Sequence, residues 1–131
     1  TQTLDDARTF DALQPYANRL TEEITRLQEV TRHLLGILAT GDAERACADA
    51  TLYMEQFSLV TIAWQWLKQA VVAKRALVGG APEGDEAAFY EAKLHTMKFF
   101  FHYELPKTLG LATRLTDTEA LTLPTEAVVM L

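Results

Sequence analysis

The fold is decided by residues 20–38, LTEEITRLQEVTRHLLGIL. Their apolar positions recur at steps of four, three, three, four and four, namely Leu20, Ile24, Leu27, Val30, Leu34 and Leu38. This spacing places the apolar side chains on one face of an α-helix, while charged residues fill the remaining arc. Pro15 suits the first turn of such a helix and Gly41 suits its end. The stretch therefore predicts one long amphipathic helix.

Two further long helices are predicted downstream. Gly41 and Asp42 form a joint, because glycine often ends a helix and aspartate often caps the next one. A second helix is therefore expected from Ala43 to Leu77. The glycine-rich residues 79–84 end it, and Asp85 is expected to cap a third helix.

The remaining segments complete an all-α prediction. Pro106 should interrupt the third helix, which resumes over Leu109–Leu115. Residues 4–13 are expected to form a separate turn-rich or short helical segment, and residues 116–131 a loose turn and a frayed end. No alternating apolar pattern indicates a sheet. We expect an antiparallel up-and-down bundle of three long helices, with room for a fourth short N-terminal helix, in one domain over residues 1–131.

Composition narrows the class of protein. The chain has 131 residues and a net charge of −6, which argues against a nucleic-acid partner. No apolar run is long enough for a membrane span. The sequence also has no basic leader with a small-residue cleavage site, so no signal peptide is expected. The single cysteine, Cys47, indicates a reducing compartment, so a cytoplasmic location is expected. The first residue is Thr1, which suggests a processed or excised piece.

The pairs of Glu and His residues that could bind a metal do not have the spacing that metal-binding helical bundles use. Di-iron bundles use Glu-x-x-His, whereas Glu29 with His33 and Glu91 with His95 lie four apart. On the third helix a polar strip lies opposite an apolar arc. The strip consists of Glu91, His95, Lys98 and His102, and the arc consists of Phe89, Met97, Phe100 and Tyr103. We interpret it as a solvated face. Cys47 is expected to be buried in a helix and inert. No metal, cofactor-binding or catalytic residue is assigned.

The second helix is apolar on two sides. Its expected core stripe consists of Met54, Phe57, Val60, Trp64, Leu67 and Val71. Leu59, Ile62 and Trp66 project from nearly the opposite side. Either the chain's own ends cover this second side, or it is a docking surface for a further domain or a second copy. The candidate interface residues are Leu59, Ile62 and Trp66, with Phe99 as a fourth.

Two stretches together resemble a known family. They are residues 53–67, YMEQFSLVTIAWQWL, and residues 88–101, AFYEAKLHTMKFFF, followed by Glu104-Leu105-Pro106. Their pattern is similar to the extra C-terminal helical domain of the longer acyl-CoA dehydrogenases, a subfamily that includes 3-methylmercaptopropionyl-CoA dehydrogenase. The likeness covers essentially the whole chain.

The resemblance implies a larger parent flavoenzyme. In such enzymes FAD accepts a hydride from an acyl-CoA, a glutamate removes a proton, and the product is a trans-2-enoyl-CoA. Electrons leave through electron-transfer flavoprotein. These parts belong to upstream domains, so the resemblance implies a chain that is inactive alone, carries no FAD, packs on those domains and joins a homo-oligomer. The alternative is a free-standing homodimerising helical interaction module. A metal-dependent bundle enzyme is a third class, which the ligand spacing disfavours.

Overall fold

The computed structural model describes residues 1–80, 83–119, 121 and 123, and this part of the chain contains helices and no strand. The elements in order are α1 (Gln2–Arg8), the 3₁₀ turn η1 (Asp11–Leu13), α2 (Gln14–Ala39), α3 (Ala43–Ala46), α4 (Ala50–Val78), α5 (Asp85–Phe99), the π-helical turn η2 (Phe100–Glu104) and α6 (Lys107–Leu115). The all-α prediction is thus confirmed for these residues. The N-terminal segment forms the short helix α1 and the turn η1, so it is both helical and turn-containing.

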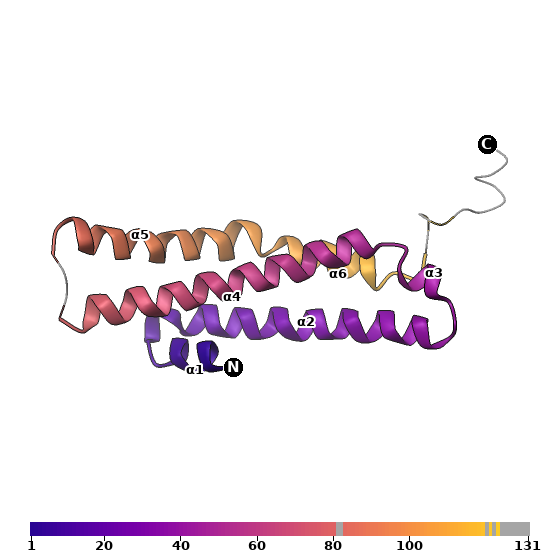
Figure 1. Ribbon diagram of the computed structural model, residues 1–131, viewed down its shortest axis with the longest axis horizontal. Helices are drawn as coiled ribbons and strands as arrows, with labels where there is room; N and C mark the ends of the chain where they lie inside the picture. The colour runs from indigo at the N-terminus through magenta and orange to yellow at the C-terminus, as the bar shows by residue number, and fades with distance from the viewer. Residues whose placement is uncertain (81–82, 120, 122, 124–131) are drawn as a thin grey trace.

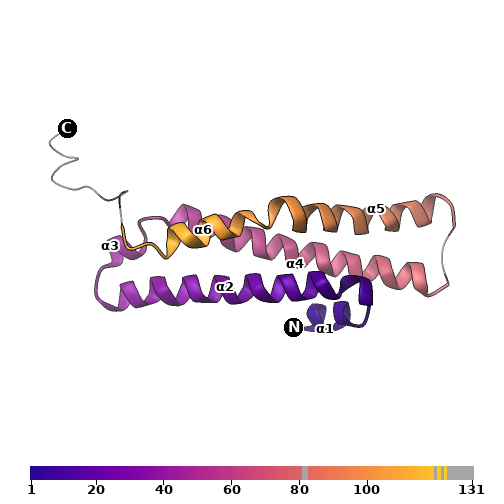
Figure 2. The ribbon, with the colours of Figure 1, turned by 180° about the vertical axis from the view of Figure 1, so that it is seen from behind.

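Helices α2 and α4 lie side by side with the succession of α5, η2 and α6 in both views of the molecule (Figures 1 and 2). Helix α4 contacts α2 on one side, and α5 and α6 on the other. The joint through α3 lies at one end of the molecule, and the last turn of α4 and the first turn of α5 lie at the other. The short α1 folds back against α2 and α4. The middle position of α4 means that it must pack on two sides.

The first joint follows the prediction closely. Helix α2 begins at Gln14 and places Pro15 in its first turn, where a missing N–H leaves no hydrogen bond unmade. Gly41 has a φ of 89°, a conformation that side chains other than glycine rarely adopt. The Oδ1 atom of Asp42 accepts a hydrogen bond from the Arg45 N–H at 3.0 Å. Asp42 is therefore the predicted cap.

Two predicted boundaries are wrong. The second helix does not run unbroken from residue 43, because α3 ends at Ala46 and α4 begins at Ala50. Asp49 adopts non-helical dihedral angles between them, and its carboxylate lies 3.5 Å from the Nε atom of Arg114 on α6. This ion pair joins the break between α3 and α4 to α6. Asp85 is the first residue of α5 rather than its cap, a position that Gly84 takes with a φ of 65°.

The predicted interruption at Pro106 is confirmed and takes the form of a π-helical turn. Leu105 donates its N–H to the carbonyl of Phe100, five residues back, at 2.9 Å. Proline has no N–H, and its ring crowds the carbonyl four residues earlier. Widening the turn over residues 100–104 relieves that crowding before the helix resumes at Lys107.

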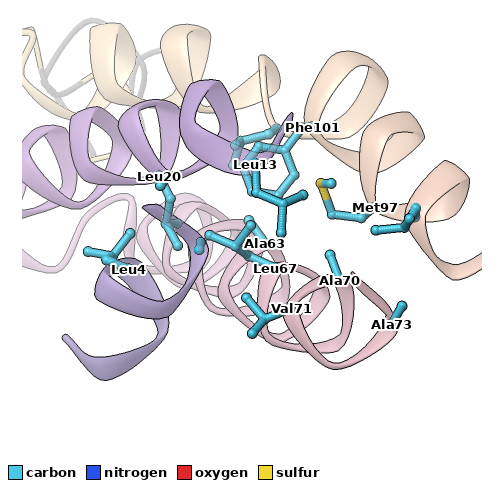
Figure 3. Packing of buried hydrophobic residues seen from close by; sticks show 14 of the residues in the cluster. Leu4, Leu13, Leu20, Ala63, Leu67, Ala70, Val71, Ala73, Met97 and Phe101 are labelled. Atoms are coloured by element: carbon cyan, nitrogen blue, oxygen red, sulfur yellow. The ribbon is translucent and has the colours of Figure 1, made fainter. Parts of the chain in front are cut away.

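The core is built on the small residues of α4. Ala63, Ala70 and Ala73 are at most 1% exposed and face side chains from α1, α2 and α5, among them Leu20 and Met97 (Figure 3). Small side chains let neighbouring helices approach α4 closely on both sides.

The predicted core stripe of α4 is therefore partly wrong. Val60, Leu67 and Val71 are buried as expected. The other three residues are exposed; they are Met54, Phe57 and Trp64. The buried alanines lie about one residue away from the predicted stripe. The buried face of α4 is therefore turned relative to that stripe, and the three large side chains lie outside it.

The predicted stripe of α2 holds through most of its length. Leu20 and Val30 are buried, and Ile24, Leu27 and Leu34 are half-buried. Leu38 is the exception, because it is 46% exposed where α2 nears its end. The expected loose end over residues 116–131 lies mostly outside the described residues.

A buried charge lies within that stripe. Glu23 is 0% exposed and sits between Leu20 and Leu27. Its Oε1 atom accepts hydrogen bonds from Arg19 at 3.0 Å and from Arg26 at 2.5 Å. Its Oε2 atom accepts the hydroxyl hydrogen bond of Thr108, from the first turn of α6. This network ties α2 to α6, directly after the π-helical turn.

Candidate interaction surface

The four predicted interface residues come from α4 and α5, and we call them the α4–α5 patch. Ile62 is 43% exposed and Phe99 is 49% exposed. Leu59 and Trp66 are half-buried. Hence none of the four is fully buried by the described residues, and part of their apolar area faces outward. Their contact with a partner stays a prediction.

A lysine links the two helices beside this patch. The Nζ atom of Lys93 on α5 lies 5.8 Å from the centre of the Trp66 ring on α4. The same atom lies 5.2 Å from the Phe89 ring. Such cation–π contacts contribute on the order of 0.5–1 kcal/mol when exposed. Lys93 thus adds a weak contact between α4 and α5 beside the patch.

A groove of about 390 Å³ runs between α4 and α5. Its lining contains two lysines and two glutamines but no carboxylate, although the chain as a whole is acidic. The lining residues are Gln65, Lys68, Gln69, Val72, Ala73, Phe89, Tyr90 and Lys93. None of the α4–α5 patch residues lines this groove.

Two exposed aromatic residues, one on α5 and one on η2, were not predicted to belong to an interaction surface. Phe89 is 56% exposed and Tyr103 is 68% exposed. The sequence prediction placed them with Met97 and Phe100 on one apolar arc opposite the polar strip, but Met97 is buried and Phe100 is half-buried. The inward face consists of Leu94, Met97 and Phe101. The 3-and-4 spacing of these three residues is visible in the sequence and could have separated the two faces.

The residues considered for metal binding do not converge. Glu29, Glu91 and His95 are exposed, and His33 is half-buried. Within the described ranges no group of three or more His, Cys, Asp or Glu side chains is placed to hold a metal ion. Cys47 is exposed at the end of α3, so the prediction of a buried cysteine is wrong. The break before α4 places it on the surface.

Besides the Glu23–Thr108 contact with α6, α2 makes a polar contact with the π-helical turn. The hydroxyl oxygen of Tyr16 lies 3.3 Å from the Nε2 atom of His102. The Tyr16 ring also packs edge-on against Phe101, with centroids 5.4 Å apart. Partial burial raises the pKa of Tyr16, because the phenolate form loses hydration. These contacts anchor the turn on α2.

Comparison with known sequences gives the family. No helix in the described part of the chain combines the length and apolar character needed to cross a membrane. No curated protein and no solved structure gives a significant match. The family described as "Acetyl-CoA dehydrogenase C-terminal like" matches residues 1–125. The chain therefore belongs to the acetyl-CoA dehydrogenase C-terminal-like family.

Proposed function

We propose that this chain is the accessory C-terminal helical domain of an FAD-dependent acyl-CoA dehydrogenase, of the longer subfamily that includes 3-methylmercaptopropionyl-CoA dehydrogenase. Its role is to pack against the upstream domains of the parent or across a subunit interface. The observation that supports this role is the outward-facing apolar area of the α4–α5 patch, which includes Ile62 and Phe99. Family membership over residues 1–125 supports the assignment to such a parent.

The proposed unit is one domain over residues 1–131, an antiparallel up-and-down bundle of three long helices. The side-by-side rods of Figures 1 and 2 support this arrangement. Two contacts support the packing of these helices on one another. Lys93 on α5 lies over the Trp66 ring on α4, and Glu23 on α2 accepts the hydroxyl hydrogen bond of Thr108 on α6.

The proposed parent oxidises an acyl-CoA to a trans-2-enoyl-CoA and passes electrons to electron-transfer flavoprotein. FAD supplies the hydride-accepting chemistry when it is bound. The α4–α5 groove of about 390 Å³ lies at the lower end of pockets for drug-sized ligands, and FAD is larger than those ligands. This groove is too small for FAD, and the family resemblance supports assigning the cofactor to the upstream domains. A cytoplasmic location is part of the same proposal.

The test compares the isolated chain with the longer polypeptide that its gene encodes. We expect the isolated chain to be colourless and unable to oxidise any acyl-CoA. The longer polypeptide is expected to show flavin absorbance and acyl-CoA-dependent reduction of an artificial electron acceptor. Stoichiometric flavin on the isolated chain would contradict the proposal, as would a longer polypeptide that holds no flavin.

The alternative is a free-standing homodimerising helical interaction module. The exposed aromatic residues of α5 favour self-association and are compatible with either function. An initiator methionine encoded directly before Thr1 would support the alternative. A reading frame that extends several hundred codons upstream would support the accessory domain.

A further inference from the structure

The groove between α4 and α5 is basic although the chain is acidic. Residues 56–78, which make up most of α4, contain two lysines, one arginine and no Asp or Glu, whereas the whole chain has a net charge of −6. Lys68 on α4 and Lys93 on α5 both line the groove, and no carboxylate lines it with them. Neither lysine forms an ion pair with a described residue. The groove therefore attracts an anion.

Two acidic residues near the groove do not cancel its charge. Asp6 on α1 lines a neighbouring hollow together with Lys68, but its carboxylate lies 3.3 Å from the guanidinium group of Arg75. Glu86 comes about one helical turn before Phe89 on α5; it is exposed and does not line the groove. Because Glu86 lies beyond the Phe89 end of the groove, it repels an anion from that end and favours one beside the lysines.

The other end of the groove is aromatic and aliphatic. The last turn of α4 and the first turn of α5 lie at the same end of the molecule, so Val72 and Ala73 line the groove at the end where Phe89 and Tyr90 line it (Figure 1). The rings of Phe89 and Tyr90 meet edge to face at 75°, with centroids 5.5 Å apart. The Nζ atom of Lys93 lies 5.2 Å from the centre of the Phe89 ring. A ligand ring placed here gains edge-to-face contacts and the attraction of an ammonium group for its face, whereas an alkyl chain gains only the burial of its area.

We propose that the α4–α5 groove binds a small aromatic carboxylate, with the ring against Phe89 and the carboxylate beside Lys68 and Lys93. Gln65 lines the groove at the lysine end and adds an amide that can donate to the carboxylate. The volume of about 390 Å³ is at the small end of ligand pockets and fits a ligand of one or two fused rings. None of the α4–α5 patch residues lines the groove, so the proposal does not depend on the packing role or on the flavoenzyme assignment.

The first test titrates the 131-residue chain with 2-naphthoate and follows the backbone amide signals by nuclear magnetic resonance. We expect saturable binding with a dissociation constant of about 0.1–1 mM, which is typical of a ligand of this size. The signals that shift are expected to belong to residues 65–73 and 89–93. Shifts spread over the other helices, or no saturation up to about 5 mM, overturn the proposal.

Two matched ligands separate the charge from the ring. The neutral 2-naphthamide keeps the aromatic rings without the charge, and decahydro-2-naphthoate keeps the charge on saturated rings. The saturated rings are at least as apolar, so the hydrophobic effect alone does not predict weaker binding for them. We expect each of the two ligands to bind at least threefold more weakly than 2-naphthoate. Equal binding of the amide overturns the role of the lysines, and equal binding of the saturated acid overturns the choice of an aromatic ligand.

The second test changes the two parts of the site one at a time. Lys68→Gln is expected to weaken 2-naphthoate binding at least threefold, and its control is Lys98→Gln, an exposed lysine of α5 outside the groove. Phe89→Leu is expected to weaken it to a similar extent, and its control is Phe57→Leu, because Phe57 is 45% exposed on α4 and lies outside the groove. All four positions are exposed, so each variant is expected to fold, which circular dichroism confirms. An equal effect of either groove variant and its control overturns the proposal.

Discussion

Replacing Glu23 by alanine tests whether the buried network fixes α6 on α2. The carboxylate is fully buried and accepts hydrogen bonds from two guanidinium groups and from Thr108. A hydrogen bond to a charged group contributes about 1.5–3 kcal/mol, so losing both guanidinium bonds removes about 3–6 kcal/mol. Rearrangement of the former partners of Glu23 offsets part of this loss in two ways, and the first concerns the two arginines. The Arg19 and Arg26 side chains are 34% and 27% exposed and can turn toward water.

The second change concerns Thr108, whose hydroxyl can donate to the carbonyl of Leu105 at 2.8 Å instead. We therefore expect Glu23→Ala to lower the free energy of unfolding by about 2–4 kcal/mol. For a chain of this length, the corresponding fall in Tm is on the order of 10 °C. Urea unfolding followed by far-UV circular dichroism measures the change, with the slope against urea concentration expected to stay constant.

The matched control is Glu22→Ala, one residue away on the exposed side of α2. Its expected effect is within about 0.5 kcal/mol of zero. Thr108→Val is expected to cost about 1–2 kcal/mol, and the double variant with Glu23→Ala should cost less than the sum of the two changes. If Glu23→Ala matches the control, or if the two changes are additive, the network does not stabilise the contact between α2 and α6.

Three further predictions concern stability. Gln56 is fully buried and neither atom of its side-chain amide bonds to a described residue, so Gln56→Met should raise the free energy of unfolding by about 1–2 kcal/mol in urea titrations; a loss would contradict this. Gly36 is exposed within α2 with open space where a Cβ would lie, so Gly36→Ala should add about 0.5–1 kcal/mol in thermal unfolding, and a lower Tm would count against it. The raised pKa of Tyr16 means that the folded state keeps its proton longer, so stability should fall as pH rises above about 10, and Tyr16→Phe should flatten that fall. An unchanged alkaline slope would contradict the assignment to Tyr16.

Helical periodicity predicted the helices well because their caps and breakers are local signals. Gly41, Asp42 and Pro106 act on their own neighbours, and each behaves as expected. The break at residues 47–49 was missed because it is accompanied by a distant ion pair, between Asp49 and Arg114. No local pattern predicts a partner that is so far away in sequence.

The inward faces were harder to predict than the helices. The sequence favours the largest apolar side chains as core, so Phe57 and Trp64 were expected inside α4. A central helix instead packs through small residues such as Ala63 and Ala70, which leaves the larger ones outside. Glu23 was overlooked because acidic residues usually lie on the surface, although its position between Leu20 and Leu27 placed it on the core face.

The most direct test of the proposed packing role measures the reactivity of a thiol at position 62. Ile62→Cys in the Cys47→Ser background is labelled with a thiol reagent, both in the isolated chain and in the longer polypeptide. Glu29→Cys on the exposed side of α2 corrects for changes in the reagent or the fold. We expect labelling at position 62 to be at least tenfold slower in the longer polypeptide and labelling at position 29 to be unchanged. Equal rates at position 62 in the two proteins would show that the upstream domains leave this surface uncovered.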